Sequence, residues 1–164
     1  MVKFFIGVMV VAFTTYCGYL CANKYRKRKS FFEALYQFNE LFLAEIAYYR
    51  RPIIEWLNNI SFKGDFALFI YEYTRRVTKQ IPIQGILVDD SIFTFLKNEE
   101  KTSIETYFSM LGKGDSVSQK NYFSNAKNLL LDWKNTTQSD YKKYADLYVK
   151  LGVFIGLAII IIII

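Results

Sequence analysis

Histidine is absent from this chain of 164 residues, and cysteine occurs only twice. Without histidine the chain lacks the commonest general base, the commonest metal ligand and every Ser/His or Cys/His nucleophile pair. The segment Gly112-Lys113-Gly114-Asp115 lacks the spacing of a P-loop and the Lys-Ser/Thr pair that completes one. We therefore expect a protein that is not an enzyme and that binds no nucleotide through such a loop.

The remaining polar groups do not suggest a catalytic or metal site. Cys17 and Cys21 lie four residues apart within an apolar run, which is typical of packing residues in a membrane helix rather than of a disulfide. The adjacent pairs Asp89-Asp90 and Glu99-Glu100 point to different faces of a helix, so we interpret them as solvated charges. We predict no catalytic residues, no cofactor and no metal.

The net charge of +6 is concentrated near one end of the chain. Six of the 21 basic residues precede Ser30, whereas all 15 acidic residues follow it, so the rest of the chain is neutral. Apart from Lys3, the excess is one cluster beside an apolar segment. This pattern is typical of a membrane border rather than of a basic nucleic-acid-binding face. The basic cluster consists of Lys24, Arg26, Lys27, Arg28 and Lys29.

The two ends of the chain have the composition of membrane segments. Residues 4–22 carry no charge, and a helix of that length spans about 28 Å, close to the thickness of a bilayer core. A cleaved signal peptide would carry its positive charge before the apolar run, whereas most of it follows here. Residues 147–164 are shorter but end in six isoleucines, and Lys150 can extend toward the headgroups. We predict an N-terminal transmembrane helix over residues 1–22 and a C-terminal one over residues 147–164.

Basic residues also predict the orientation of these segments. The basic cluster follows the first segment, and Lys142, Lys143 and Lys150 precede or begin the second, while only Lys3 lies on the other side. The positive-inside rule therefore places residues 23–146 in the cytoplasm and both termini across the membrane.

Between the membrane segments the sequence predicts an all-α helical bundle. Ser30 and Glu33 have the spacing of a capping box, and Pro52 ends the helix that they open and starts a short one. Asp65 is a predicted N-cap for residues 66–79. The stripe of the first bundle helix is Phe31, Leu35, Phe38, Phe42, Ile46 and Tyr49.

The second half of the bundle has clear breaks before its last helix. Residues 80–90 contain Pro82 and Gly85 and form a predicted connector, followed by short helices at 91–97 and 100–111. Gly112 and Gly114 end the last of these, and Asp115 or Ser116 starts a helix without a breaker to Ile164. Its heptad-like positions are Phe123, Ala126, Leu130, Trp133, Thr137, Asp140, Tyr144, Leu147 and Leu151.

Small residues predict that the two membrane segments pack together. Gly152 and Gly156 form a GxxxG motif, while Thr14, Gly18 and Ala22 recur at four-residue steps in the first segment. The alternative is that glycine is simply frequent in membrane helices. The many Phe and Tyr residues are explained by core packing and interfacial anchoring, so we expect no nucleic-acid binding.

The order of these parts resembles stage III sporulation protein AB of endospore-forming bacteria. Four segments carry the resemblance: residues 43–48 (LAEIAY), residues 52–57 (PIIEWL), residues 111–119, and the entry of the last helix into its GxxxG motif. Either these residues shape helix ends and corners, or they contact a partner. The matched positions are Glu45, Tyr48, Pro52, Glu55, Leu111, Gly112, Asp115 and Gln119.

The resemblance implies a part in the complex that joins mother cell and forespore across their envelopes. The family is similar to the inner-membrane platform protein of type II secretion and type IV pilus machines. Its cytoplasmic domain would meet a secretion-type ATPase, and its membrane helices would hold other membrane subunits in the mother-cell membrane around the forespore, with homo-oligomers possible.

Three other functions are weighed against this one. The first is a platform-like subunit of a type II secretion or type IV pilus machine, although such proteins usually duplicate the cytoplasmic domain and this chain contains no internal repeat. A membrane enzyme acting on lipids would need clustered polar residues at the interface, where only basic ones occur. A small regulatory or toxin-like membrane protein would not need so large a structured domain.

Overall fold

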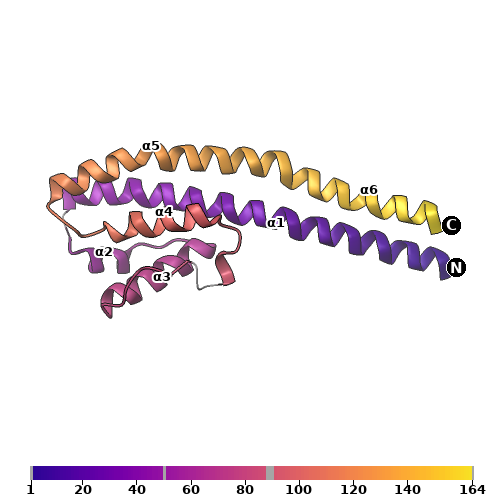
Figure 1. Ribbon diagram of the computed structural model, residues 1–164, viewed down its shortest axis with the longest axis horizontal. Coiled ribbons are helices and arrows are strands. Elements are labelled where there is room, and N and C mark those ends of the chain that lie inside the picture. Colours follow the sequence, from indigo (N-terminus) through magenta and orange to yellow (C-terminus); the bar gives the residue numbers. More distant parts are fainter. Residues whose placement is uncertain (1, 50, 88–90, 164) are drawn as a thin grey trace. The chain divides into compact units, whose positions relative to one another are not determined.

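The computed structural model is built from helices (Figure 1). It describes residues 2–49, 51–87 and 91–163, without the side chains of residues 2–6 and 162–163. Over these ranges there is no strand, which confirms the predicted all-α class. The elements are α1 (Val2–Ala44), a π turn η1 (Glu45–Tyr49), α2 (Ile53–Asn59), α3 (Gly64–Thr78), a 3-10 turn η2 (Ser91–Phe93), α4 (Asn98–Ser109), α5 (Ser116–Asp140), a second π turn η3 (Tyr141–Ala145) and α6 (Asp146–Ile163).

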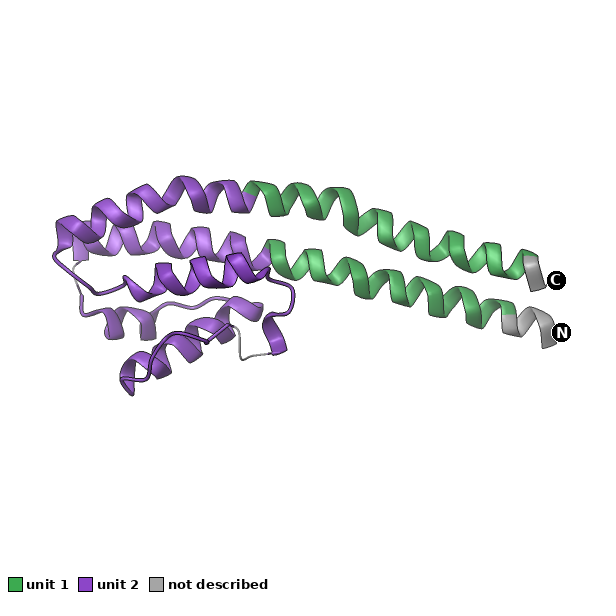
Figure 2. Ribbon diagram, viewed as in Figure 1, with its two compact units in different colours: residues 1–29, 135–164 green, residues 30–134 purple. Residues whose placement is uncertain are grey.

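The chain divides into two compact units (Figure 2). Unit 1 consists of residues 1–29 and 135–164, and unit 2 of residues 30–134. These borders differ from those predicted at residues 22 and 146, because the pairing of helices within unit 1 continues beyond the apolar segments. Arg28 and Asp140 form an ion pair of 3.0 Å, and the Lys29 ammonium lies 5.1 Å from the centre of the Tyr141 ring.

The predicted helix start at Ser30 is wrong. Ser30 lies inside α1, which runs without interruption from Val2 to Ala44. No glycine or proline follows Gly18 within this helix, so nothing forces the backbone out of the helical conformation where the capping-box spacing occurs. A serine followed three residues later by glutamate acts as a capping box only where a helix begins, and no helix begins at Ser30.

Aromatic side chains form the core of unit 2. Phe31, Leu35, Phe38 and Phe42 of α1 are buried as predicted, whereas Tyr49 is 69% exposed because the π turn η1 changes the helical register after Ala44. Ring pairs join distant segments. The centroids of Phe42 and Phe123 are 4.7 Å apart, as are those of Phe69 and Phe108, and both pairs meet edge to face. The stripe of α1 packs through rings against α3 (Phe31 on Phe66), α4 (Phe38 on Phe108) and α5 (Phe42 on Phe123).

Helix boundaries in unit 2 follow the predicted breaks with two differences. α3 begins at Gly64, so Asp65 lies in its first turn, near the positive end of the helix dipole, instead of capping it. The helix expected at residues 91–97 is only the short η2 followed by a turn. In the predicted connector, residue 80 and residues 84–87 lie in turns, residues 81–83 have no regular structure, and residues 88–90 lie outside the described part of the chain.

The last helix contains a π turn that the sequence did not predict. η3 inserts roughly one residue relative to an α-helix and so rotates the following residues by about 100°. The heptad positions Leu147 and Leu151 are therefore 45% and 43% exposed, while Gly152 and Gly156 are buried. The residues of the predicted heptad stripe therefore face inward only up to η3, and those beyond it are exposed.

Candidate functional site

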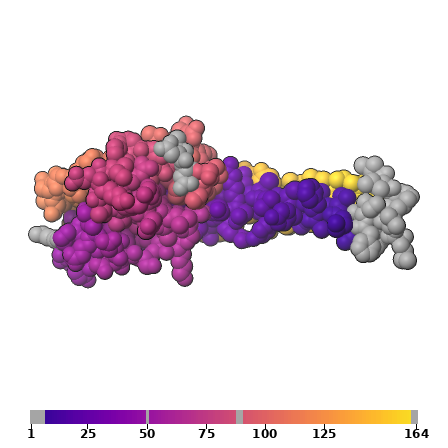
Figure 3. All heavy atoms as spheres, turned by 90° about the horizontal axis from the view of Figure 1, so that it is seen from below, coloured from indigo at the N-terminus to yellow at the C-terminus, as the bar shows by residue number. Residues whose placement is uncertain are grey.

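Small residues bring the two helices of unit 1 into backbone contact. A β-carbon added to Gly152 would lie 2.6 Å from the backbone oxygen of Thr14, and one added to Gly156 would lie 2.8 Å from the Cα of Val11. Real β-carbons essentially never approach other atoms so closely, so only glycine fits at these positions. In the space-filling view, the atoms of the first helix lie against those of the C-terminal helix along unit 1 (Figure 3).

The first helix contributes small residues to the same contact. A β-carbon on Gly18 would collide with the backbone oxygen of Tyr148, and Ala22, one turn further, is buried. The Thr14 hydroxyl donates to the backbone oxygens of Val10 and Val11 at 3.1 Å, so its polarity is satisfied within its own helix. Thr14, Gly18, Gly152 and Gly156 thus form one glycine-containing interface, defined here as the small-residue seam.

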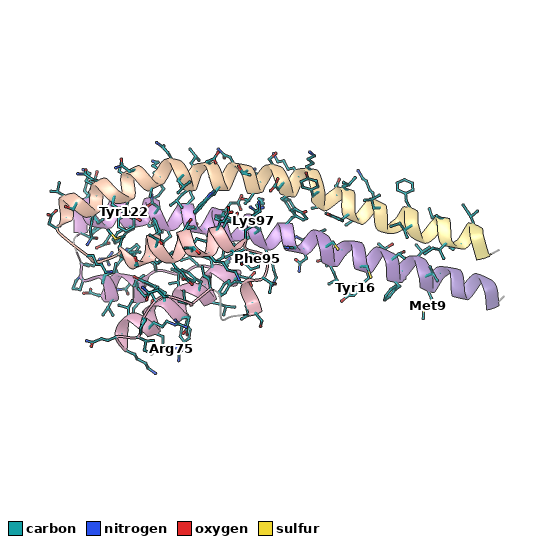
Figure 4. The ribbon with its side chains drawn as sticks, viewed as in Figure 1. Met9, Tyr16, Arg75, Phe95, Lys97 and Tyr122 are labelled. Carbon is teal, nitrogen blue, oxygen red and sulfur yellow. The ribbon has the colours of Figure 1, made fainter. Side chains whose placement is uncertain are left out.

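The outer surface of unit 1 is apolar over residues 7–22 and 151–161. Met9 is 71% exposed and Tyr16 59%, on the side of α1 turned away from α6 (Figure 4). Phe154 and Ile161 of the C-terminal helix are 67% and 79% exposed. An exposed apolar surface of this extent marks an interface with a membrane or another protein.

One helix among the described residues is long and apolar enough to cross a membrane. It covers residues 116–161, and only 11% of its most apolar 18-residue stretch is buried, whereas the core helix of a soluble protein would be mostly buried. The predicted first span covers residues 1–22, and residue 1 and the side chains of residues 2–6 lie outside the described part of the chain. The two-span arrangement therefore stays a prediction.

Most of the basic cluster engages neighbouring side chains of unit 1. Arg26 donates to the Tyr19 hydroxyl at 3.3 Å, and Arg28, whose side chain is 11% exposed, donates to Asp140 at 3.0 Å. Lys24, in contrast, is exposed. The cluster therefore combines residues that hold the two helices together with residues that face the surroundings.

Three stacked tyrosines separate the small-residue seam from this polar region. The Tyr25 ring lies 5.4 Å from that of Tyr144 and 5.7 Å from that of Tyr148. Tyrosine is the residue type enriched at the border between the apolar and polar zones of a bilayer. This stack could not be predicted from the sequence, because η3 determines which side chains of the last helix face α1.

In unit 2, the structure brings separate family-motif segments to one cleft. The cleft has a volume of about 250 Å³ and lies between the end of α1, the start of α2 and the start of α5. Glu45, Gly112 and Gln119, which are up to 74 positions apart in the chain, all line it. Trp56 forms part of its apolar wall.

An ion pair fixes one side of the cleft. Arg51 donates to both carboxylate oxygens of Glu45, at 2.9 Å from Nε and 2.6 Å from Nη2, and its backbone N–H adds a third bond of 3.0 Å. The Glu45 side chain is 5% exposed and that of Arg51 39%. The guanidinium holds the pKa of Glu45 below its ordinary value, although burial alone would raise it. The sequence pattern indicated Glu45 as a family-motif residue but not Arg51. The one feature that could have pointed to Arg51 is its position directly before the motif residue Pro52.

Several motif residues have a clear structural role. The backbone oxygen of Pro52 accepts the N–H of Trp56 at 3.0 Å in the first turn of α2, and Leu111 is buried. Gly112 has a φ of +74°, a left-handed conformation that favours glycine and follows the end of α4. Asp115 accepts the Ser118 N–H at 2.7 Å, which caps α5 and lowers the pKa of Asp115.

Tyr48 and Glu55 differ from these residues because they face outward. Tyr48 is 81% exposed, in the same π turn whose first residue, Glu45, lines the cleft. Glu55 is exposed on α2. Burial explains neither of these two motif positions. Glu55 also lies in the first turn of α2, near the positive end of the helix dipole. Both side chains are exposed and so available for contact with a partner.

The described part of the chain contains no group of three His, Cys, Asp or Glu side chains that could hold a metal ion. Cys17 and Cys21 are free and exposed.

These features define an all-helical protein in which a small-residue seam joins two apolar helical segments and a separate aromatic-core unit carries a motif-lined cleft. Residues 3–164 match the model of the family described as stage III sporulation protein AB. The chain belongs to this family and is a sporulation-related protein. No curated protein matches the chain, and no solved structure does.

Proposed function

We propose that this protein is a non-enzymatic platform subunit of the secretion-like complex that joins mother cell and forespore across their envelopes. In this role, unit 1 holds the protein in the membrane with other membrane subunits, and unit 2 binds a cytoplasmic secretion-type ATPase. The observation that carries the proposal is the convergence of family-motif residues at one cleft, next to a tyrosine that is 81% exposed.

A non-enzymatic role agrees with the chemistry of the cleft. Its one buried carboxylate, Glu45, is bound by Arg51 through both oxygens and is therefore occupied rather than free to transfer protons. The chain contains no histidine that could take that role.

The apolar surface of unit 1 supports a location in the mother-cell membrane around the forespore. Two spans with unit 2 in the cytoplasm follow from the positive-inside rule applied to the basic cluster and to Lys142, Lys143 and Lys150. Anionic headgroups are then the counterions of the exposed basic residues.

We assign the contact with the ATPase to the surface around Tyr48. Large aromatic residues contribute most of the energy in many protein interfaces, and truncating such a residue costs about 2 kcal/mol or more, roughly a thirtyfold change in affinity. Glu55, on the next family-motif segment along the chain, adds a negative charge that favours a partner with a complementary positive charge.

The test is to purify the tagged full-length protein from detergent-solubilised membranes of sporulating cells. A secretion-type ATPase should copurify, and Tyr48→Ala should reduce its recovery at least tenfold. Tyr71→Ala is the matched control, because Tyr71 is 71% exposed on α3 of the same unit but lies outside the family motif, so it should leave recovery unchanged.

Three results would contradict the proposal. The ATPase could be missing in repeated purifications, the protein could be expressed only in vegetative cells, or the Tyr48 and Tyr71 variants could lose the ATPase equally. If deletion impaired pili or protein secretion and left spore formation intact, the alternative platform role in a type IV pilus or type II secretion machine would replace this one.

A further inference from the structure

A narrow apolar groove lies beside the small-residue seam in unit 1. Its volume is about 360 Å³. Gly18 and Gly152, where the two backbones are in contact, form its floor. Its walls are formed by larger side chains of both helices, including Cys17, Cys21, Leu151 and Ile155.

The shape and the lining of the groove indicate what kind of molecule fills it. The lining extends over about 10 Å of the first helix, from Thr14 to Cys21, and no charged side chain belongs to it. The Thr14 hydroxyl is bonded within its own helix, so the groove offers an almost wholly apolar surface. A long, thin and flexible apolar chain fits this shape, and acyl chains surround unit 1 in the membrane location proposed above.

A positive charge lies in line with one end of the groove. Cys17, Cys21 and Lys24 follow one another at four- and three-residue steps, so they share one stripe of α1, and Lys24 is about one turn beyond the last lining residue. The next residue of the stripe, Arg28, has its charge matched by Asp140, whereas Lys24 is exposed. No acidic residue lines the groove.

We propose that this groove binds one acyl chain of an anionic phospholipid whose phosphate is held at Lys24. The proposal rests on the membrane location proposed above for unit 1. Charge complementarity selects an anionic over a zwitterionic headgroup, and the apolar walls take the chain. The bound lipid covers one side of the small-residue seam, so it acts as a structural part of the helix pair rather than as part of the mobile bilayer.

The test is native mass spectrometry of the full chain, released from vesicles that contain equal amounts of phosphatidylglycerol and phosphatidylcholine. Wild-type protein should retain one phospholipid, with phosphatidylglycerol favoured about fivefold, as expected for one basic residue near the surface at about 1 kcal/mol. Lys24→Gln should keep the bound lipid but lose the preference. Its matched control, Lys142→Gln, removes an exposed border lysine and should leave the preference intact.

A second pair of variants tests the groove itself. Cys17→Trp places a bulky ring in it and should abolish lipid retention. Phe154→Trp places the same indole ring at a side chain that is 67% exposed and does not line the groove, and it should retain the lipid. If Cys17→Trp prevents folding, as judged by circular dichroism, Lys24→Gln and Lys142→Gln test the lipid site instead. Both lysines are exposed, so their replacement should leave the fold intact.

The possible results separate this inference from the proposed function. Equal retention of both lipids by the wild type, retention of none, or an unchanged preference in Lys24→Gln would overturn the lipid site while the protein still fractionates with membranes. Retention of a second copy of the chain in place of lipid would also overturn it. Failure of the protein to fractionate with membranes would contradict the location of unit 1, and the lipid site with it.

Discussion

Glu45 is a buried carboxylate that keeps its charge because Arg51 binds both of its oxygens. The two partners of this ion pair differ in exposure, since the carboxylate is almost inaccessible to solvent while the guanidinium is partly open to it. Water therefore screens it from one side only, and the attraction outweighs the burial that would otherwise raise the pKa of Glu45. Because Arg51 occupies both of its oxygens, the motif residue Glu45 stabilises the fold at this position rather than binding a partner directly.

The lowered pKa of Glu45 predicts how the stability of unit 2 depends on pH. A carboxyl group whose pKa is lower in the folded state stabilises that state above its ordinary pKa of 4.5, and this contribution is lost as the pH falls through the lowered value. The unfolding temperature of the full chain in detergent should therefore fall between about pH 6 and pH 3. Fluorescence measures it for unit 2, because Trp56 and Trp133 are the only tryptophans.

Glu45→Gln should unfold at a lower temperature at neutral pH and show a smaller decrease on acidification. Glu55→Gln is the control, because Glu55 is an exposed carboxylate near the same cleft, and it should behave as the wild type. The same acid-dependent decrease in Glu45→Gln and in the wild type would show that other carboxylates cause it.

The helices of unit 1 approach each other closely because glycines occur where their backbones meet. A β-carbon added to any seam glycine would lie within 2.8 Å of a backbone atom of the other helix, so rotating a side chain cannot make room for it. Gly7 is different, because an added β-carbon there would meet only side-chain atoms of Ile160, the nearest of them at 3.3 Å. The seam glycines thus face the backbone of the other helix, whereas Gly7 faces a side chain, and alanine substitutions at one glycine of each kind can test this difference.

Gly152→Ala should weaken pairing of the two helices, since an overpacked contact costs about 1–3 kcal/mol. Gly7→Ala, the matched control, should have little effect because the Ile160 side chain can shift. A membrane two-hybrid assay with residues 1–29 and 135–164 on separate reporters measures the pairing. Equal signals from the two variants would show that the seam does not hold the helices together.

The π turn η3 determines which face of the last helix enters the seam. Deleting the exposed residue Lys142 should restore a continuous α-helical register, rotate α6 by about 100° and turn Leu147 and Leu151 inward. The two-hybrid signal should then fall about as far as it does for Gly152→Ala. Lys142→Ala keeps the residue count and should pair normally, and normal pairing of the deletion variant would contradict this role of the turn.

The charge distribution of the molecule predicts its topology. All of the excess positive charge precedes Ser30, so the positive-inside rule places unit 2 in the cytoplasm. Alkaline phosphatase, which is active only outside the cytoplasm, should be active when fused after Ile164 and inactive when inserted after Lys79. Activity at the internal site would reverse the orientation, and activity at neither site would mean that the C-terminal helix does not cross.

Much of the architecture could be predicted from the sequence because it depends on local chemistry. The aromatic stripe from Phe31 to Phe42 and the helix ends at Pro52, Gly112 and Asp115 are set by periodicity, backbone conformation and capping, and the structure contains them. The false start at Ser30 shows the limit of such signals, since a capping motif has no effect where the preceding residues keep the helix intact.

The all-helical class, the family motifs and the position of the excess charge can be read from the amino-acid sequence, because each depends on residue types and their order along the chain. Three features required the folded structure: the pairing of Glu45 with Arg51, the cleft that Gly112 and Gln119 share with them, and the contact of Gly152 and Gly156, rather than Leu147 and Leu151, with α1. Those outcomes depend on contacts between distant residues and on the helical register after two π turns. A single residue inserted in such a turn rotates the following helix, and the hydrophobic pattern does not show where that happens.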